Sequence, residues 1–177
     1  THPALVAEIV RWLRDNGNED ITVADSPGGT YRRSYLKSIY EASGYIKLAE
    51  DVRLNYDTGF RTVTCPEGFL CRSFNIIDPI VNADYIISAA KLKTHALTTM
   101  TAGVKNLFGA VPGLQKPECH FKYPDIDDFC RVLVELALIV APQVTVIDAV
   151  EAMEGNGPVN GRVRKTGLTL ASRDVFS

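Results

Sequence analysis

Apolar side chains recur at helical spacing in several stretches of the chain. The clearest stretch runs from Ile126 to Val140, and acidic residues lie at its start, where they suit the positive end of a helix dipole. Near the chain start, Pro3 fits a first helical turn, and Asn16-Gly17 marks where that helix ends. Two further helices are predicted by the same spacing, over residues 33–42 and 98–108.

Short apolar runs bounded by polar or glycine-rich residues predict buried strands. Residues 53–56 and 60–64 flank Asp57-Thr58-Gly59, a spacing that predicts a β-hairpin. The other predicted strands are residues 21–25, 72–76, 84–90, 143–148 and 166–172. Because helices alternate with buried strands, we predict an α/β fold. The expected architecture is a mixed sheet flanked by helices in three layers, with an irregular β-hairpin insertion in the middle.

Composition narrows the class of protein. The chain has 177 residues, 46% hydrophobic and 23% charged, which predicts one globular α/β domain over residues 1–177. Its net charge of −2 gives no reason to expect nucleic acid or a membrane surface as partner, and no apolar run is long enough to span a bilayer. No export leader is visible, and four cysteines are too few for a disulfide scaffold. We therefore predict a cytoplasmic protein with reduced thiols.

Candidate chemistry gathers where predicted strands end, the usual place for a ligand in open α/β sheets. In Asp25-Ser26-Pro27-Gly28-Gly29, two glycines let the backbone turn its N–H groups toward an anion. A plain strand-to-helix turn explains the same residues. Directly after another predicted strand comes Lys91-Leu92-Lys93-Thr94-His95, which favours an anion or metal site over a solvated strand end.

A basic patch extends this second candidate. From Lys91 to Lys122 the chain has five lysines and two histidines against one acid, Glu118. Lys105 and Asn106 lie on the helix predicted over 98–108, and the excess of positive charge suggests a small anionic ligand, phosphate or carboxylate. A lysine-rich surface explains the patch equally well. His120 is either a surface residue or, together with His95, a ligand or proton relay.

The last candidate is Asp148, followed by Glu151-Ala152-Met153-Glu154-Gly155-Asn156-Gly157-Pro158. Glu154 has the chemistry of a base or metal ligand, and Asp148 that of a group that orients a His or Lys. A tight turn with solvated acids is the alternative. The predicted catalytic residues are His95, His120, Asp148 and Glu154. The predicted ligand-binding residues are Asp25, Ser26, Gly28, Gly29, Lys91, Lys93, Thr94, Lys105, Asn106, Gly155, Asn156 and Gly157.

Several of these motifs, in this order, resemble the domain of unknown function 362 (DUF362) family. The resemblance covers almost the whole chain and rests on Thr-His-Pro at 1–3, Asp-Ser-Pro-Gly-Gly at 25–29, Lys-Leu-Lys-Thr-His at 91–95, Thr-Ala-Gly-Val-Lys-Asn-Leu-Phe-Gly at 101–109, Glu-Ala-Met-Glu-Gly-Asn-Gly-Pro at 151–158 and Ser-Arg-Asp at 172–174. It implies that the chain is the excised core of a longer protein. Family members are often described as iron–sulfur cluster-binding proteins. This chain has no Cys-x-x-Cys run, so a 4Fe–4S cluster is expected in a longer parent protein and not on this chain.

The stretch from Gly103 to His120 is also similar, more loosely, to a segment of nickel-dependent lactate racemase-type proteins. Our hypothesis is a core domain that binds a small anion or a metal, as the substrate-binding half of an iron–sulfur-associated redox enzyme. Two alternatives stay open. One is a non-catalytic scaffold that docks a ferredoxin-like domain or redox partner, and the other is a metal-dependent isomerase-like domain.

Overall fold

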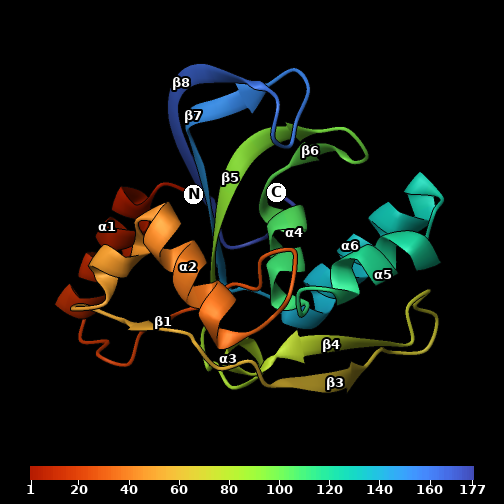
Figure 1. Cartoon of the computed structure of the whole chain (residues 1–177), viewed down its shortest axis with the longest axis horizontal. Helices are drawn as coiled ribbons and strands as arrows, with labels where there is room; N and C mark the ends of the chain where they lie inside the picture. The colour runs from red at the N-terminus through yellow and green to blue at the C-terminus, as the bar shows by residue number, and fades with distance from the viewer.

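A mixed four-stranded sheet lies at the centre of the computed structural model, which describes all 177 residues (Figure 1). The strand order is β6-β5-β7-β8. The two central strands are parallel to each other, and each edge strand is antiparallel to its neighbour. The strand bounds are β5 (Ile87–His95), β6 (Thr99–Thr101), β7 (Val144–Glu154) and β8 (Arg162–Ser172). The predicted mixed sheet is confirmed.

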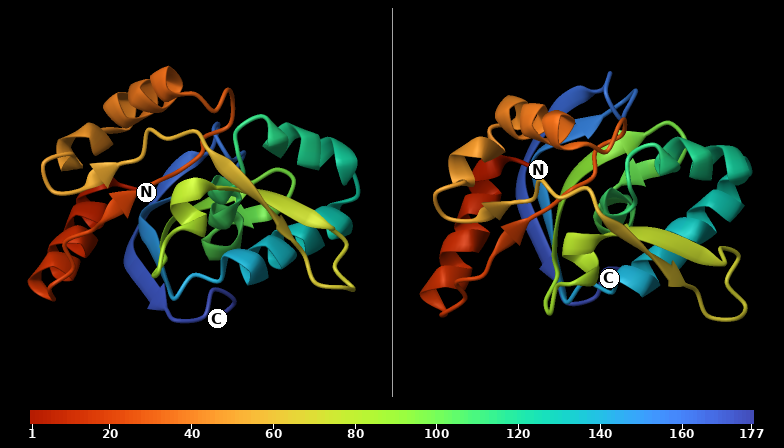
Figure 2. Two further views of the ribbon diagram at one scale, coloured as in Figure 1. Left: turned by 90° about the horizontal axis from the view of Figure 1, so that it is seen from below. Right: turned by 60° about the horizontal axis from the view of Figure 1, so that its bottom comes forward.

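Helices cover both faces of this sheet (Figures 1 and 2). On one side lie α1 (Pro3–Asp15) and α2 (Arg33–Ser43), and on the other lie α4 (Gly103–Asn106) and α6 (Ile126–Val140). A cluster of 7 buried apolar residues lies under α1 and α2, and one of 14 lies around α6. The chain therefore has the predicted α/β class and layered arrangement.

Local sequence explains where the best-predicted helices begin and end. The Asp125 side chain accepts hydrogen bonds from the backbone N–H groups of Asp127 and Asp128, which caps α6. His2 caps α1 in the same way, because its Nδ1 accepts from the Ala4 N–H at 3.2 Å. Gly44 ends α2 with a left-handed φ of 79°, which glycine adopts without steric cost.

The hairpin predicted around Asp57-Thr58-Gly59 is wrong. Strand β2 (Arg53–Leu54) pairs in parallel with β1 (Thr22–Val23) instead. Leu54 is buried in the α1-side cluster, so apolar burial outweighed the local turn signal. The hairpin insertion exists, but it is formed by the next pair of strands. These are β3 (Phe60–Thr64) and β4 (Ser73–Ile77), which are antiparallel.

The helix predicted over 98–108 is confirmed only in its second half, because residues 99–101 form β6. Thr99 has a positive φ of 61°, which turns the chain back so that β6 pairs with β5. Met100 of β6 is 54% exposed. The chain forms α4 from Gly103 onward, and a 3-10 turn follows it. The next helix, α5 (Gln115–Lys122), was not predicted from the sequence pattern. The remaining helical elements are η1 (Tyr45–Leu48), α3 (Asp78–Val81) and η2 (Leu107–Ala110).

Candidate functional site

The two central strands are longer than predicted, which changes the position of two motifs. Strand β5 ends at His95 and not at Ala90, so Lys91, Lys93 and Thr94 lie within the sheet. Strand β7 likewise continues past Asp148 to Glu154. Both extensions run beside strands that satisfy their backbone hydrogen bonds, β6 in one case and β8 in the other.

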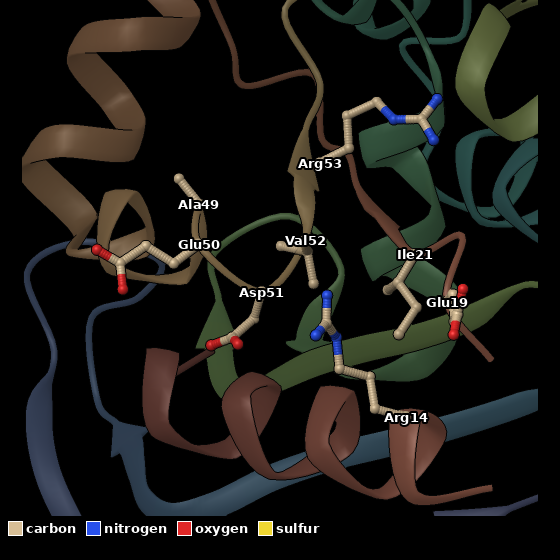
Figure 3. Close-up of a pocket in the computed structure, with 8 residues that line it drawn as sticks. All are labelled: Arg14, Glu19, Ile21, Ala49, Glu50, Asp51, Val52 and Arg53. Atoms are coloured by element: carbon tan, nitrogen blue, oxygen red, sulfur yellow. The ribbon is translucent and has the colours of Figure 1, made fainter. Parts of the chain in front are cut away.

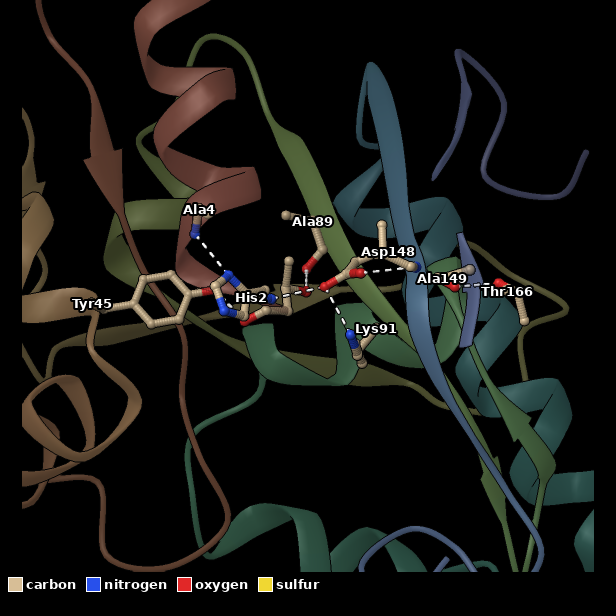
Figure 4. A network of polar contacts seen from close by, with 10 residues as sticks. His2, Ala4, Tyr45, Ala89, Lys91, Asp148, Ala149 and Thr166 are labelled. Atoms are coloured by element: carbon tan, nitrogen blue, oxygen red, sulfur yellow. Dashed lines mark hydrogen bonds and ion pairs between the residues drawn. The ribbon is translucent and has the colours of Figure 1, made fainter. Parts of the chain in front are cut away.

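Asp148 is the centre of a buried polar network (Figure 4). One oxygen, Oδ2, accepts hydrogen bonds from the Lys91 amine at 3.0 Å and from the His2 N–H at 2.9 Å. Oδ1 accepts from the Val150 N–H at 3.3 Å. Burial alone would raise the pKa of Asp148, but these hydrogen bonds and the Lys91 charge outweigh it and lower the pKa. Thus the Asp148 carboxylate is ionised and accepts hydrogen bonds from three donors within the protein.

This network also explains the Thr-His-Pro motif at the start of the chain. The Thr1 hydroxyl donates to the Ala89 carbonyl at 2.7 Å, and the Tyr45 hydroxyl donates to the Thr1 carbonyl at 3.1 Å. His2 uses its backbone on Asp148 and its ring as the helix cap. Together these contacts fasten the first residues to β5 and β7.

A second group of polar residues has a different character. It consists of five basic side chains from β5, α4 and α5, which we call the cationic cluster: Lys93, His95, Lys105, Lys116 and His120. All five are half-buried. None of them is among the eight salt bridges of the structure. The structure therefore brings together five of the seven basic residues of the predicted patch, and leaves out Lys91, which pairs with Asp148, and Lys122, which lies over the Tyr123 ring.

Two buried phenyl rings form the base of the cationic cluster. Phe108 and Phe129 meet edge to face with 5.8 Å between their ring centroids. The His120 ring stacks on Phe129 at 4.1 Å. The Lys105 amine lies 5.2 Å from the Phe108 centroid and 5.9 Å from that of Phe129, and the Lys116 amine lies 5.9 Å from Phe108. The aromatic faces attract these cations but cannot neutralise them.

Burial and the neighbouring positive charges lower the pKa values of the basic groups in the cationic cluster. Burial lowers the pKa of His95, and the charges of Lys105, His120 and Lys93 lower it further. Burial also lowers the pKa of Lys105, with Lys93 adding to the effect. For Lys116, burial lowers the pKa to about 8 although Asp25 opposes the change. An anion bound here would relieve this repulsion.

The Asp25-Ser26-Pro27-Gly28-Gly29 loop lies beside the cationic cluster. Asp25 reaches the surface, yet the protein atoms crowded around its carboxyl exclude water and raise its pKa, an effect that the Lys116 charge opposes. Ser26 is fully buried, and its Oγ accepts from the Gly113 N–H at 2.7 Å. A Cβ on Gly113 would overlap the Gly29 carbonyl. The glycines therefore allow two loops to touch, and the buried Ser26 joins them.

Sequence reasoning did not single out Lys116 as a site residue. Lys116 was one of the five lysines counted between Lys91 and Lys122, but α5 was not predicted. Its amine donates to the Ser26 carbonyl, which links α5 to the Asp25 loop. The helix pattern of α5 is hard to detect because it has no buried residue.

Other predicted site residues lie outside the cationic cluster. Asn106 donates to the buried Ser88 hydroxyl at 3.0 Å and so fixes α4 to β5. Glu154 is exposed and 3.9 Å from Arg164. The Thr94 hydroxyl is buried without a hydrogen-bond partner, and its carbonyl lies against Gly157. Three residues have no contact with the cationic cluster among the recorded interactions: Gly28, Gly155 and Asn156.

A hollow elsewhere on the molecule is lined by none of the predicted catalytic or ligand-binding residues (Figure 3). It has a volume of about 210 Å³ and lies between the end of α1 and the β2 region. Its lining residues are Arg14, Glu19, Ile21, Ala49, Glu50, Asp51, Val52 and Arg53. Its charged residues are two arginines and three acids, and all five are exposed. This hollow does not have the polarity of a selective anion site.

No three His, Cys, Asp or Glu side chains are grouped so as to hold a metal ion. All four cysteines are free thiols. None of the helices combines the length and the apolar character needed to cross a membrane.

Comparison with known proteins identifies the family. The model of the domain of unknown function DUF362 matches residues 1–177. The chain belongs to the DUF362 family. A thylakoid-associated protein of Synechocystis sp. is 36% identical to it over 180 residues, which cover 100% of the chain and 54% of that protein.

The DUF362 chain thus spans about half the length of this curated relative. A crystal structure of a Thermotoga maritima protein is 14% identical and superposes with a TM-score of 0.45, covering 87% of the chain and 43% of that protein. A similarity this low carries no argument about function. The family description itself assigns no activity, so the function must be argued from the side chains.

Proposed function

We propose that this DUF362 domain binds a small anion, a phosphate or a carboxylate, at the cationic cluster. The supporting observation is that five basic side chains converge there without a salt bridge while burial and mutual repulsion lower the pKa values of four of them. Such an arrangement is unfavourable in the free protein and is stabilised by a bound anion.

The shape of the cationic cluster favours a small ligand over a docked protein partner. Its five members are half-buried, and Lys105, Lys116 and His120 rest on Phe108 and Phe129. Steering of an acidic protein relies instead on exposed lysines. Lys93, Lys105 and Lys116 would hold the negative charge. The Nδ1 atom of His95 accepts hydrogen bonds from the N–H groups of Leu97 and Thr98 at 3.2 and 3.3 Å. The neutral ring, which its lowered pKa favours, therefore carries its proton on Nε2 and would donate it to the anion.

Asp148 and Glu154 have no place in this proposed site. The Asp148 oxygens are already occupied by three donors, and Glu154 is exposed beside Arg164. The metal-dependent alternative gains no support either, because no three ligand side chains are grouped.

In a longer protein, we propose this domain as the substrate-binding part of a redox enzyme. A 4Fe–4S cluster there would need ligands from outside the 177 residues, since no metal-ligand group occurs among them. The cytoplasmic location also stays a prediction. The relative's name places that protein with thylakoids, so fractionation of cells that express this chain is the direct check.

The test is calorimetric titration of the chain with inorganic phosphate and, separately, with oxalate. Lys105→Met should weaken binding of the preferred anion by about tenfold, because it removes one close charge while keeping the apolar stem. Lys47→Met is the matched control, since Lys47 is an exposed lysine of η1 outside the cationic cluster. Equal affinities in the wild type and both variants, or no binding of either anion, would overturn the proposal.

A further inference from the structure

We infer that Lys105 is a nucleophilic lysine that forms an imine with the carbonyl group of a small 2-oxo acid. This inference rests on the proposed anion site and adds a covalent step to it. It rests on the apolar surroundings of the Lys105 amine, on its lack of a hydrogen-bond acceptor and on the basic side chains around it.

Lys105 differs from the other lysines around it. The Lys91 amine is paired with Asp148, and the Lys116 amine donates to the Ser26 carbonyl. The Lys105 amine has no recorded hydrogen bond or salt bridge and lies over two phenyl rings, 5.2 Å and 5.9 Å from their centroids. An amine held against apolar surface beside other cations loses its proton more easily, and the neutral amine is the nucleophile.

The groups that face Lys105 come from three elements. Strand β5 supplies Lys93 and His95, α5 supplies Lys116, Cys119 and His120, and α6 supplies Cys130. Lys93 would hold the carboxylate of the ligand. The adjacent carbonyl of a 2-oxo acid is the group with which the Lys105 amine can form an imine, which phosphate and a simple carboxylate cannot do.

The chemical step is balanced without any further reagent. The Lys105 nitrogen attacks the carbonyl carbon, a C–N bond forms, and the oxygen takes up a proton to give a carbinolamine. The C–O bond then breaks, the oxygen leaves as water, and a C=N bond remains. The two protons of the neutral amine depart with that water.

The experiment is reductive trapping of the whole 177-residue chain with pyruvate and cyanoborohydride, followed by intact mass measurement and peptide mapping. We expect the fastest reduced pyruvate adduct on the peptide that contains Lys105, at a rate about tenfold above that of the exposed Lys47, because more of the Lys105 amine is neutral. The Lys116 and Thr1 amines also have lowered pKa values, so faster labelling of either would overturn the inference. Labelling spread over exposed lysines with no preference for Lys105 would overturn the inference.

Two variants separate this inference from the proposed function. Lys105→Arg keeps a positive charge but cannot form an imine, so it should retain phosphate or oxalate binding and lose the adduct. Lys93→Met should slow trapping at Lys105 while leaving the amine in place. If Lys105→Arg is labelled like the wild type, the imine is excluded although anion binding stands. If the wild type binds no anion and is not labelled, both proposals fail.

Discussion

Lys91 and Lys93 are two residues apart on the same strand, β5, and have opposite surroundings. The Lys91 amine meets a buried carboxylate whose other acceptor positions are filled by backbone N–H groups. Lys93 faces Lys105 and His95 and makes no salt bridge. A compensated charge stabilises the fold, whereas an uncompensated group of charges would be stabilised by a bound anion. The difference between the two lysines is the basis of the structural role proposed for the Asp148 network and of the binding role proposed for the cationic cluster.

The largest expected effect is a loss of stability when the Asp148 network is broken. Asp148→Ala removes the acceptor of Lys91 and of two backbone N–H groups, and should lower the free energy of unfolding by about 3 kcal/mol. Thermal or denaturant unfolding measures this loss. Glu151→Ala is the control, because Glu151 and Lys165 are 3.8 Å apart on the surface with side chains 57% and 82% exposed. That variant should change stability by less than about 0.5 kcal/mol, and an equal loss in both would contradict the assignment.

A second substitution, Gly113→Ala, disrupts the contact between the loop that carries Asp25 and the segment that precedes Lys116. In Gly113→Ala the new methyl group would overlap the Gly29 carbonyl, so stability should fall by about 2 kcal/mol as the loops move apart. Gly28→Ala serves for comparison, since a Cβ there meets nothing within 4 Å. Urea denaturation of the two variants gives the difference. If Gly113→Ala were as stable as Gly28→Ala, the loop contact would not be tight.

The same substitution at the two lysines of β5, Lys91 and Lys93, separates stability from anion binding. Lys91→Met should destabilise the fold by about 2 kcal/mol, because it leaves the Asp148 carboxylate buried without its cation, and should leave the affinity for sulfate unchanged. Lys93→Met should keep stability within about 0.5 kcal/mol and weaken sulfate binding by about tenfold. Unfolding curves and calorimetric titrations on both variants test all four values. The reverse pattern would refute the comparison.

The smallest expected effect is a pH dependence of anion binding. The pKa of Lys116 is about 8, so Lys116 loses its charge as the pH rises from 7 to 9, and sulfate affinity should fall several-fold. His95 and His120 have pKa values below their ordinary value and gain charge only on acidification, which should strengthen binding. Sulfate is the suitable probe because its own charge is constant here. A flat profile from pH 7 to 9 would exclude Lys116 from the site.

Stability should respond to Lys116 with the opposite sign. Its pKa is lower in the folded protein than in the unfolded chain, so between pH 8 and about 10 the unfolded chain binds more protons. The contribution of Lys116 to stability therefore rises with pH in this window, while anion binding weakens. Unfolding experiments at pH 7.5 and 9.5 in the wild type and in Lys116→Met isolate this term.

The amino-acid sequence determined much of the fold because several signals are local. Helix α6 begins at a capping aspartate and carries a continuous apolar stripe, and α2 ends at a glycine that the left-handed conformation favours. These features need only neighbouring residues, so the pattern predicted both helices within a residue or two. The excess of lysine between residues 91 and 122 also indicated the chemistry of the candidate site from composition alone.

Tertiary structure decided the rest. Leu54 pairs with Val23 and not with the 60–64 segment, because burial against α1 and α2 stabilises the parallel pair more than the local turn does. The roles of Lys91 and Lys93 depend on whether a carboxylate from β7 or a lysine from α4 lies opposite, a choice that their spacing in the sequence does not encode. Charge compensation is a property of neighbours in space, so only the folded chain separates the structural lysine from the binding one.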